Sequence, residues 1–207
     1  MKKILCYGDS NTFGYIPRGN GARYDENTRW TMVLSNLLGQ DYTVFEEGLN
    51  GRTTIFDDNI DGRNGLKSVG LCITNHEAPD LMIIMLGTND SKTRFHSNEI
   101  VIANGIEAVL QKAKFFLPSK AKILLIAPPL LGKNIENTHQ FDFDKQSREI
   151  SEKLAPLYKA VADRNKCSFL NAAEIIESSE GDKVHLTPEA HRAFAEKLCE
   201  EVKKIIG

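Results

Sequence analysis

The chain has 207 residues, of which 41% are hydrophobic and 26% are charged, and its formal net charge is −2. This length fits one domain spanning residues 1–207, and the hydrophobic fraction is high enough to form a packed core. Lysines and arginines are scattered along the chain, and no long run of one charge occurs. Composition therefore gives no electrostatic reason to expect nucleic acid or an anionic membrane as a partner.

The four cysteines are Cys6, Cys72, Cys167 and Cys199. They lie far apart, whereas zinc knuckles and disulfide frameworks need close pairs, so we expect free thiols and no bound metal. The apolar run after the first lysines covers only residues 4–7, too short for the core of a signal peptide. The longest apolar run, 81–86, is far below the roughly 20 residues of a membrane span. We therefore expect a cytoplasmic protein that does not bind membranes.

Short apolar runs alternate with longer amphipathic patterns along the chain. The strand candidates, in chain order, are residues 3–7, 42–46, 81–86, 123–127 and 168–170. The helical patterns cover residues 30–38, 99–117, 147–164 and 188–206. Two of the strand candidates, 81–86 and 123–127, are apolar throughout, which is typical of strands covered on both faces. This alternation predicts a three-layer α/β/α sandwich around a five-stranded, mostly parallel sheet.

Three loops that follow predicted strands share an unusual composition. They are residues 8–12 (GDSNT), 47–53 (EGLNGRT) and 87–90 (GTND). All three are rich in glycine and small polar side chains. Because binding sites in such folds open at the carboxyl ends of the strands, we expect these loops to converge at one edge of the sheet. Surface loops alone can have this composition, but three in register are harder to dismiss.

Ser10 is a candidate nucleophile, since it sits in the turn after a buried strand. A serine hydroxyl needs a base to take its proton, and among the five histidines only His185 has an aspartate three residues before it. In a turn, this spacing brings Asp182 against one ring nitrogen and leaves the other for the serine. Two alternatives stay open: Asp9 or Ser10 caps a helix, or Asp182 and His185 are solvated loop residues.

Acyl transfer also needs donors for the oxygen that becomes negative. The backbone N–H of Gly51, the side-chain amide of Asn89 and the N–H of Ser10 are candidates. Each has a simpler interpretation, because Gly51 suits an unusual φ and Asn89 suits a cap or a turn.

Together, the blocks Gly8-Asp9-Ser10, Gly51, 87–90 and Asp182-x-x-His185 resemble the four signature blocks of the SGNH (GDSL-type) hydrolases. They occur in the family's order and span nearly the whole chain. The resemblance implies a flavodoxin-like sandwich and no metal or organic cofactor. It also implies that Ser10 attacks the acyl carbon of a small-molecule ester, that His185 is the base and that Asp182 orients it. Ser10, Gly51 and Asn89 then form the oxyanion hole.

A narrower resemblance links residues 6–14, 29–30, 46–54 and 83–90 to the bacterial arylesterase and acyltransferase branch. Members cleave small aryl and alkyl esters, some transfer acetyl groups to alcohols, and many form oligomers, which implies a homo-oligomer. Asn11 stands where many members carry leucine, and Phe13 stands where a tryptophan is common. The first departure leaves the polarity of the acyl or alcohol pocket open, and the second predicts a roomier pocket.

Specificity should lie in the loops 15–27, 57–67, 92–98 and 130–144. Besides Asn11 and Phe13, the candidate substrate contacts are Thr88, Lys92, Phe141 and Phe143. The two phenylalanines suit an apolar acyl pocket, or pin their loop to the core. Lys92 suits a polar substrate, although solvation is the simpler expectation for a loop lysine.

The same residues leave several functions open. We expect a carboxylesterase for short acyl chains first, while a carbohydrate O-deacetylase or a small acyl thioesterase would use the same residues. A flavodoxin-like binding module is the non-enzymatic alternative, but no GxGxxG or GxxxxGK[ST] motif follows a strand. A relative without activity is a further alternative, which the presence of all expected side chains does not favour.

Overall fold

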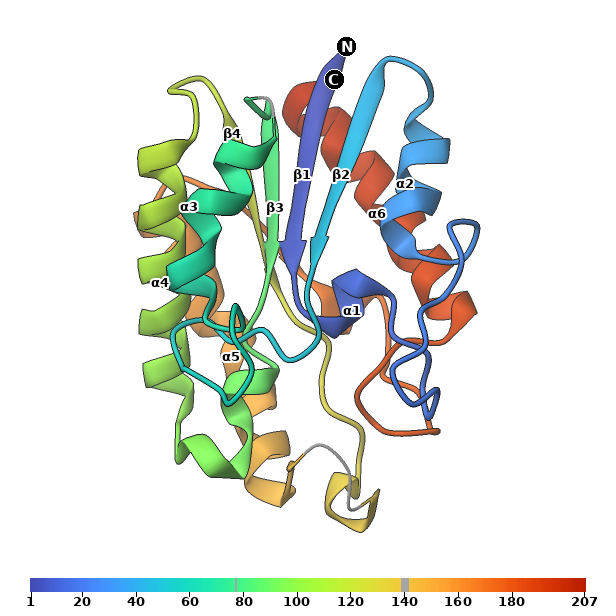
Figure 1. The fold of residues 1–207 in the computed structure, drawn as a ribbon, viewed down its shortest axis with the longest axis vertical. Helices are drawn as coiled ribbons and strands as arrows, with labels where there is room; N and C mark the ends of the chain where they lie inside the picture. Colours follow the sequence, from blue (N-terminus) through green and yellow to red (C-terminus); the bar gives the residue numbers. More distant parts are fainter. Residues whose placement is uncertain (77, 139–141) are drawn as a thin grey trace.

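A parallel β-sheet forms the centre of the computed structural model, which describes residues 1–76, 78–138 and 142–207 (Figure 1). Its strands are β1 (Lys2–Gly8), β2 (Tyr42–Gly48), β3 (Leu81–Met85), β4 (Lys122–Ala127) and β5 (Ser168–Asn171). The order is β2-β1-β3-β4-β5 and every neighbouring pair is parallel. This is the flavodoxin-like order, so the predicted fold class is confirmed, with all rather than most pairs parallel.

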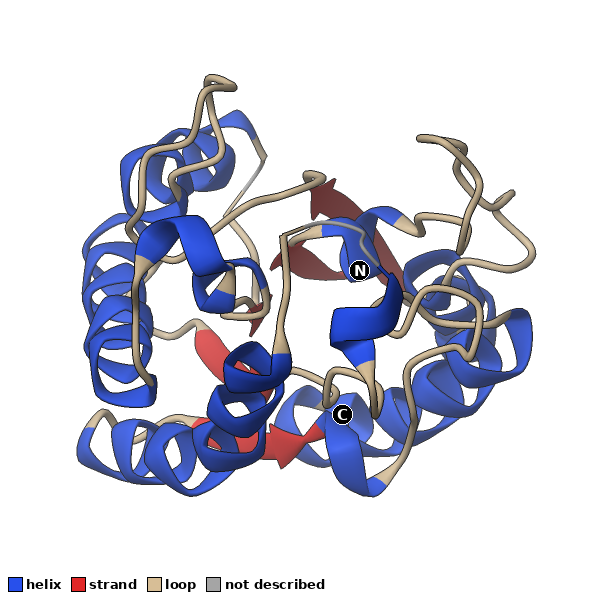
Figure 2. Ribbon diagram, turned by 90° about the horizontal axis from the view of Figure 1, so that it is seen from below, coloured by secondary structure: helices blue, strands red, loops and turns tan. Residues whose placement is uncertain are grey.

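Helices cover both faces of this sheet. They are α1 (Ser10–Phe13), α2 (Trp30–Leu38), α3 (Gly65–Asn75), α4 (Glu99–Phe116), α5 (Lys145–Arg164) and α6 (Pro188–Ile206). Helices α3, α4 and α5 pack over one face, and α2 and α6 over the other. Figure 2 looks at the end of the molecule toward which the strands run and shows both helical layers. Within the described chain, no helix is both long and apolar enough to cross a membrane.

The burial of β1 explains why it is apolar along its length. Leu5 and Tyr7 enter the hydrophobic cluster beneath α3, α4 and α5, whereas Ile4 and Cys6 enter the cluster beneath α2 and α6. Side chains alternate between the two faces of a strand, so in a strand covered on both sides no position faces solvent and apolar residues are favoured throughout. The Cys6 thiol is fully buried, as expected for a core residue.

Helix α3 is the longest helix that the sequence pattern does not predict. It contains two glycines, Gly65 and Gly70, which lower helix propensity in isolation. Packing accounts for one of them, because a Cβ on Gly70 would lie 2.6 Å from the ring of Phe116 on α4. The helix begins where the Asn64 side chain accepts a hydrogen bond from the N–H of Lys67. Contacts made only after folding therefore explain a helix that local preference alone does not indicate.

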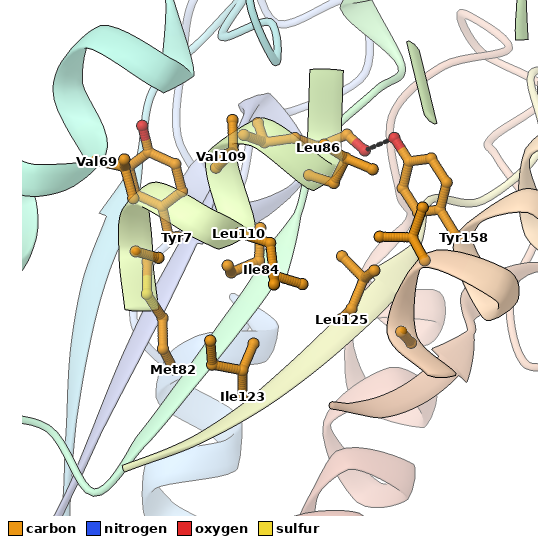
Figure 3. Packing of buried hydrophobic residues seen from close by; sticks show 14 of the residues in the cluster. Tyr7, Val69, Met82, Ile84, Leu86, Val109, Leu110, Ile123, Leu125 and Tyr158 are labelled. Carbon is orange, nitrogen blue, oxygen red and sulfur yellow. Dashed lines mark hydrogen bonds between the residues drawn. The ribbon is translucent and has the colours of Figure 1, made fainter. Parts of the chain in front are cut away.

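Close packing restricts the backbone conformation of the two residues, Leu86 and Gly87, that follow β3. The Tyr158 hydroxyl on α5 donates to the carbonyl of Leu86 at 2.9 Å, in the middle of the apolar core (Figure 3). The next residue, Gly87, has φ +121°, and a Cβ there would lie 2.2 Å from the same hydroxyl. Glycine is therefore required for the tyrosine to approach the backbone. This contact sets the direction of the loop that carries Asn89.

Replacing Tyr158 with phenylalanine should lower the free energy of unfolding by about 1–3 kcal/mol, because the buried carbonyl of Leu86 would lose its donor. Urea unfolding followed by circular dichroism measures this change. Tyr42→Phe is the matched control, since its half-buried ring lies on the edge strand β2, and we expect a change within about 0.5 kcal/mol. Equal effects of the two substitutions would contradict the importance of the buried hydrogen bond.

Candidate active site

Ser10 lies at the start of α1, two residues after β1 ends. The Asp9 side chain caps this short helix by accepting a hydrogen bond from the N–H of Asn11 at 3.0 Å. The capping alternative is therefore correct for Asp9, and it leaves the Ser10 hydroxyl available. Helix α1 lies close against β2, because a Cβ on Gly48 would be only 2.2 Å from the backbone nitrogen of Phe13. The end of β1 and this contact together fix α1, which begins with Ser10, at the carboxyl end of the sheet, where Figure 1 shows this helix.

His185 joins Ser10 to Asp182 through two hydrogen bonds. Its Nε2 lies 2.9 Å from Ser10 Oγ, and its Nδ1 lies 2.7 Å from Asp182 Oδ2. Serine, histidine and aspartate are thus brought together from opposite ends of the chain. With exposed fractions of 3% for His185 and 0% for Asp182, neither is a solvated loop residue.

The turn that holds the histidine is organised by the same carboxylate. Asp182 Oδ1 accepts hydrogen bonds from the backbone N–H groups of Val184, at 3.0 Å, and His185, at 2.9 Å. Lys183, between Asp182 and Val184, adopts φ +65°. Burial acts to raise the pKa of Asp182, but the hydrogen bonds and the charge of His185 outweigh it and lower the pKa to about 2. The carboxylate is therefore ionised at every pH at which the protein is expected to work.

The two further oxyanion candidates reach the same place from other strands. Gly51 follows β2 with φ +80°, a conformation that favours glycine. Asn89 follows β3, and its Nδ2 donates to the carbonyl of Arg52 at 3.1 Å and lies 3.5 Å from Asp9 Oδ2. Gly51, Asn89, Ser10 and His185 line one pocket of about 300 Å³.

The rest of the pocket lining comes from several loops. The described residues that complete it are Tyr15, Gly21, Asn50, Arg63, Lys92, Phe143 and Val184. The ring of Tyr15 stacks on the imidazole of His185, with centroids 4.2 Å apart. Tyr15 and Arg63 are not among the candidates from the sequence. Both belong to loops expected to carry specificity, but nothing in their local sequence distinguishes them from surface residues.

The predicted substrate contacts divide into two groups. Lys92 and Phe143 line the pocket, and Lys92 is 7% exposed, so the expectation that it is solvated is wrong. Asn11, Phe13 and Thr88 are not part of that lining. The Asn11 amide donates to the carbonyl of Val184 at 3.2 Å, and Thr88 is buried.

Two of the predicted contacts need separate comment. The Phe13 ring lies against the guanidinium of Arg23, 4.7 Å from the ring centroid. Phe141 lies outside the described residues. As substrate contacts, all six residues stay predictions.

Asp90, the last residue of the 87–90 block, ties two of the loops together. Its carboxylate accepts hydrogen bonds from the N–H of Thr54, at 2.9 and 3.0 Å, and from the Thr54 hydroxyl. This contact joins the loop after β3 to the loop after β2. Burial raises the pKa of Asp90 to about 6, although the hydrogen bonds from Thr54 oppose the shift. Burial likewise raises the pKa of Asp9 to about 6.

Among the described residues, no group of three or more histidine, cysteine, aspartate and glutamate side chains is arranged to hold a metal ion. The cysteines that the structure describes are free thiols, and three of them are buried.

Comparison with known proteins identifies the family. Residues 6–193 match the model of the GDSL-like lipase/acylhydrolase family. Est24, a carbohydrate acetylesterase from Sinorhizobium meliloti, is 34% identical, with a TM-score of 0.92 and 100% of both chains covered. The aryl esterase of M. smegmatis is 35% identical, with a TM-score of 0.90 and again 100% of both chains covered. No curated protein sequence matches this chain.

The chain therefore belongs to the GDSL-like lipase/acylhydrolase family. Its class is that of the carboxylic ester hydrolases. The resemblance drawn from the four sequence blocks is confirmed.

The buried carboxylates predict how stability depends on pH. A carboxyl group whose pKa is higher in the folded than in the unfolded chain binds a proton more tightly when folded. It therefore adds stability as pH falls from about 6 toward 4, and this contribution is lost as pH rises. We expect wild type to gain on the order of 1–3 kcal/mol relative to Asp90→Asn between pH 7.5 and pH 4.5, measured by urea unfolding at both values.

Asp41→Asn, on the exposed turn before β2, serves as the control and should keep the wild-type pH dependence. A constant difference between wild type and Asp90→Asn at the two pH values would show that Asp90 does not carry a buried charge.

Proposed function

We propose that this protein is a serine esterase that removes short acyl groups from small esters through an acyl-enzyme on Ser10. The observation that carries the proposal is the continuous pair of hydrogen bonds from Asp182 through His185 to Ser10 Oγ, at 2.7 and 2.9 Å. A hydroxyl bonded to a buried, oriented imidazole is the arrangement that activates a serine.

In the proposed reaction, Ser10 Oγ attacks the acyl carbon while His185 Nε2 takes the hydroxyl proton. The carbonyl oxygen becomes negative and is stabilised by the N–H groups of Ser10 and Gly51 and by the Asn89 amide. His185 then gives its proton to the departing alcohol. A water molecule, or a second alcohol in acyl transfer, attacks the acyl-enzyme with His185 again acting as the base.

The size of the pocket favours short acyl chains. Its volume of about 300 Å³ is at the lower end for small-molecule sites. Phe143 and Val184 contribute apolar surface, while Arg63, Asn89 and Lys92 bring polar groups into the lining. A long hydrocarbon chain would leave these polar groups unpaired, which is costly in a confined site.

A carbohydrate O-deacetylase is the second candidate. It is favoured by the similarity to Est24 over the whole chain and by the hydrogen-bonding groups of Tyr15, Asn50 and Arg63 in the pocket. The chemistry on Ser10 is the same in both cases, and the alcohol that leaves is different. A panel of acetylated sugars beside aryl acetates separates the two, because a deacetylase should show the higher kcat/KM on the sugars.

The first test is hydrolysis of p-nitrophenyl acetate, butyrate and octanoate by wild type and by Ser10→Ala. We expect wild type to be fastest on the acetate and slowest on the octanoate. Ser10→Ala should lose at least 10³-fold in kcat, because it removes the nucleophile. Ser119→Ala is the control, since that serine is exposed in the turn before β4. Retained activity in Ser10→Ala, or absence of wild-type activity on aryl and sugar esters alike, would overturn the proposal.

Asp182→Asn tests the role of the carboxylate. Asparagine has a similar shape, but its NH2 group would donate to Nδ1 of His185 instead of accepting a hydrogen bond from it. The imidazole would then be held in the wrong tautomer, so we expect kcat to fall roughly 10³–10⁴-fold. Stopped-assay kinetics on p-nitrophenyl acetate, together with a thermal melt to confirm folding, measure the effect. A loss of less than tenfold in a folded variant would contradict an orienting role for Asp182.

A further inference from the structure

Lys92 is a largely enclosed residue that brings a positive charge to the pocket of the candidate nucleophile. It follows the short 3-10 turn Asn89–Ser91, and it lines the pocket that holds Ser10 and His185. Its residue surface is 7% exposed, and its ammonium lies 5.6 Å from the centroid of the Phe143 ring. No residue that the structure describes forms a hydrogen bond or an ion pair with this ammonium.

The neighbouring cations differ from Lys92 because each has a carboxylate partner. Arg63 pairs with Asp58 at 2.8 Å. Arg94 pairs with Asp142 at 2.7 Å and approaches Asp58 at 3.4 Å. Two acids are thus shared by two guanidinium groups, and among the described residues no carboxylate forms an ion pair with Lys92. Because Lys92 lines the pocket, its ammonium can pair with a negatively charged group of a bound ligand.

The charged side chains that line the pocket are positive. Two of its described residues, Lys92 and Arg63, are cationic, and none is a carboxylate. The side chain of Arg63 packs on Gly51, where an added Cβ would lie 2.6 Å from Arg63 Nε. Lys92 is three residues beyond Asn89. Both cations therefore stand beside the proposed oxyanion donors, within reach of a small bound ester.

We propose that Lys92, assisted by Arg63, binds a carboxylate carried by the substrate, so that the preferred substrates are short esters bearing a negative charge. This inference rests on the proposed esterase function and names its substrate class. The charge can lie on the acyl half or on the alcohol half of the ester, since the pocket receives both. Lys92 thus acts as a specificity residue that recognises a group away from the reacting carbon.

A different role is open to the same cations, because they could stabilise the oxyanion of any ester. The two roles make different predictions. If Lys92 stabilises the oxyanion, removing its charge lowers kcat/KM equally for neutral and charged substrates. Recognition of a substrate carboxylate is lost for charged substrates alone, so the ratio of the two kcat/KM values separates the roles.

The ionisation of Lys92 adds a pH signature. Burial, reinforced by the charges of Arg94 and Arg63, lowers the pKa of Lys92 to about 8. The ammonium is therefore mostly protonated at pH 7 and mostly neutral at pH 9. The titratable or charged groups around it are Asp9, Asp58, Arg63, Arg94, His96, Asp144, His185 and Tyr15. Effects of His185 on catalysis act on both substrates and cancel in the ratio.

The experiment compares matched pairs of esters. For the alcohol half, the pair is 4-acetoxybenzoate and the neutral 4-acetoxybenzamide, and for the acyl half it is monomethyl succinate and dimethyl succinate. With wild type at pH 7, we expect kcat/KM for the charged member of at least one pair to exceed that for the neutral member at least tenfold. The pair that shows the preference identifies which half of the ester carries the charge.

Lys92→Met keeps an unbranched apolar side chain at this position and removes the charge. We expect it to lower the charged-to-neutral ratio at least tenfold and to abolish the decrease of that ratio from pH 7 to pH 9. Lys145→Met is the control, because Lys145 is exposed at the start of α5, and it should keep the wild-type ratio. Thermal melts confirm that both variants fold.

A binding measurement separates failure of this inference from failure of the proposed function. Calorimetric titration of Ser10→Ala should give a dissociation constant for 4-acetoxybenzoate or monomethyl succinate at least tenfold lower than for its neutral partner, whether or not wild type hydrolyses the ester. Equal affinities in both pairs, or an unchanged ratio in folded Lys92→Met, would overturn the assignment of Lys92.

Discussion

The burial of a parallel sheet on both faces is the constraint from which the rest of this structure follows. The carboxyl ends of all its strands lie on the same side of the molecule. Where the chain leaves the sheet there, each buried backbone N–H and C=O group needs a hydrogen-bond partner other than water. Tyr158 donates to the carbonyl of Leu86 at 2.9 Å, and Arg52 donates to that of Gly8 at 2.9 Å. These donors come from a distant helix and from a neighbouring loop, so satisfying the edge also sets the course of the loops. The candidate active site is built on the segments held in this way.

Aspartates at the carboxyl ends of the strands have pKa values that are shifted in opposite directions. Asp90 and Asp9 are buried with too few compensating charges, and burial raises the pKa of each to about 6. Asp182 is also buried, yet its pKa falls to about 2 because His185 and two backbone N–H groups bind its oxygens. The hydrogen bond and the opposing charge of His185 distinguish Asp182 from the other two aspartates. Asp90 is placed to join two loops, whereas Asp182 is placed to hold a charge opposite an imidazole, and the proposed chemistry uses that charge.

The sequence predicts the parts of this structure that depend on local pattern. The five strands, four of the helices and the layered architecture follow from hydrophobic periodicity, and the spacing of Asp182 and His185 is a short-range signal. Helix α3 is missed because its glycines are explained by the ring of Phe116, a contact that exists only after folding. The positions of Lys92 and Arg63 in the pocket are even harder to predict from the sequence. A lysine in a loop of polar residues is normally solvated, and its 7% exposure depends on tertiary contacts such as that with the Phe143 ring, whose centroid lies 5.6 Å from its ammonium.

The hydrogen bonds of Asn89 explain how the proposed oxyanion hole is ready before an ester binds. An amide nitrogen has two protons. One is held by the carbonyl of Arg52 at 3.1 Å, which fixes the orientation of the side chain, whereas the contact with Asp9 Oδ2 at 3.5 Å is long and weak. A carbonyl oxygen that gains negative charge can accept a hydrogen bond from the second N–H in place of this weak contact, while the first hydrogen bond keeps the amide in position. Stabilisation of the transition state then needs no rearrangement of the loop, and this is the condition under which such donors lower a barrier most.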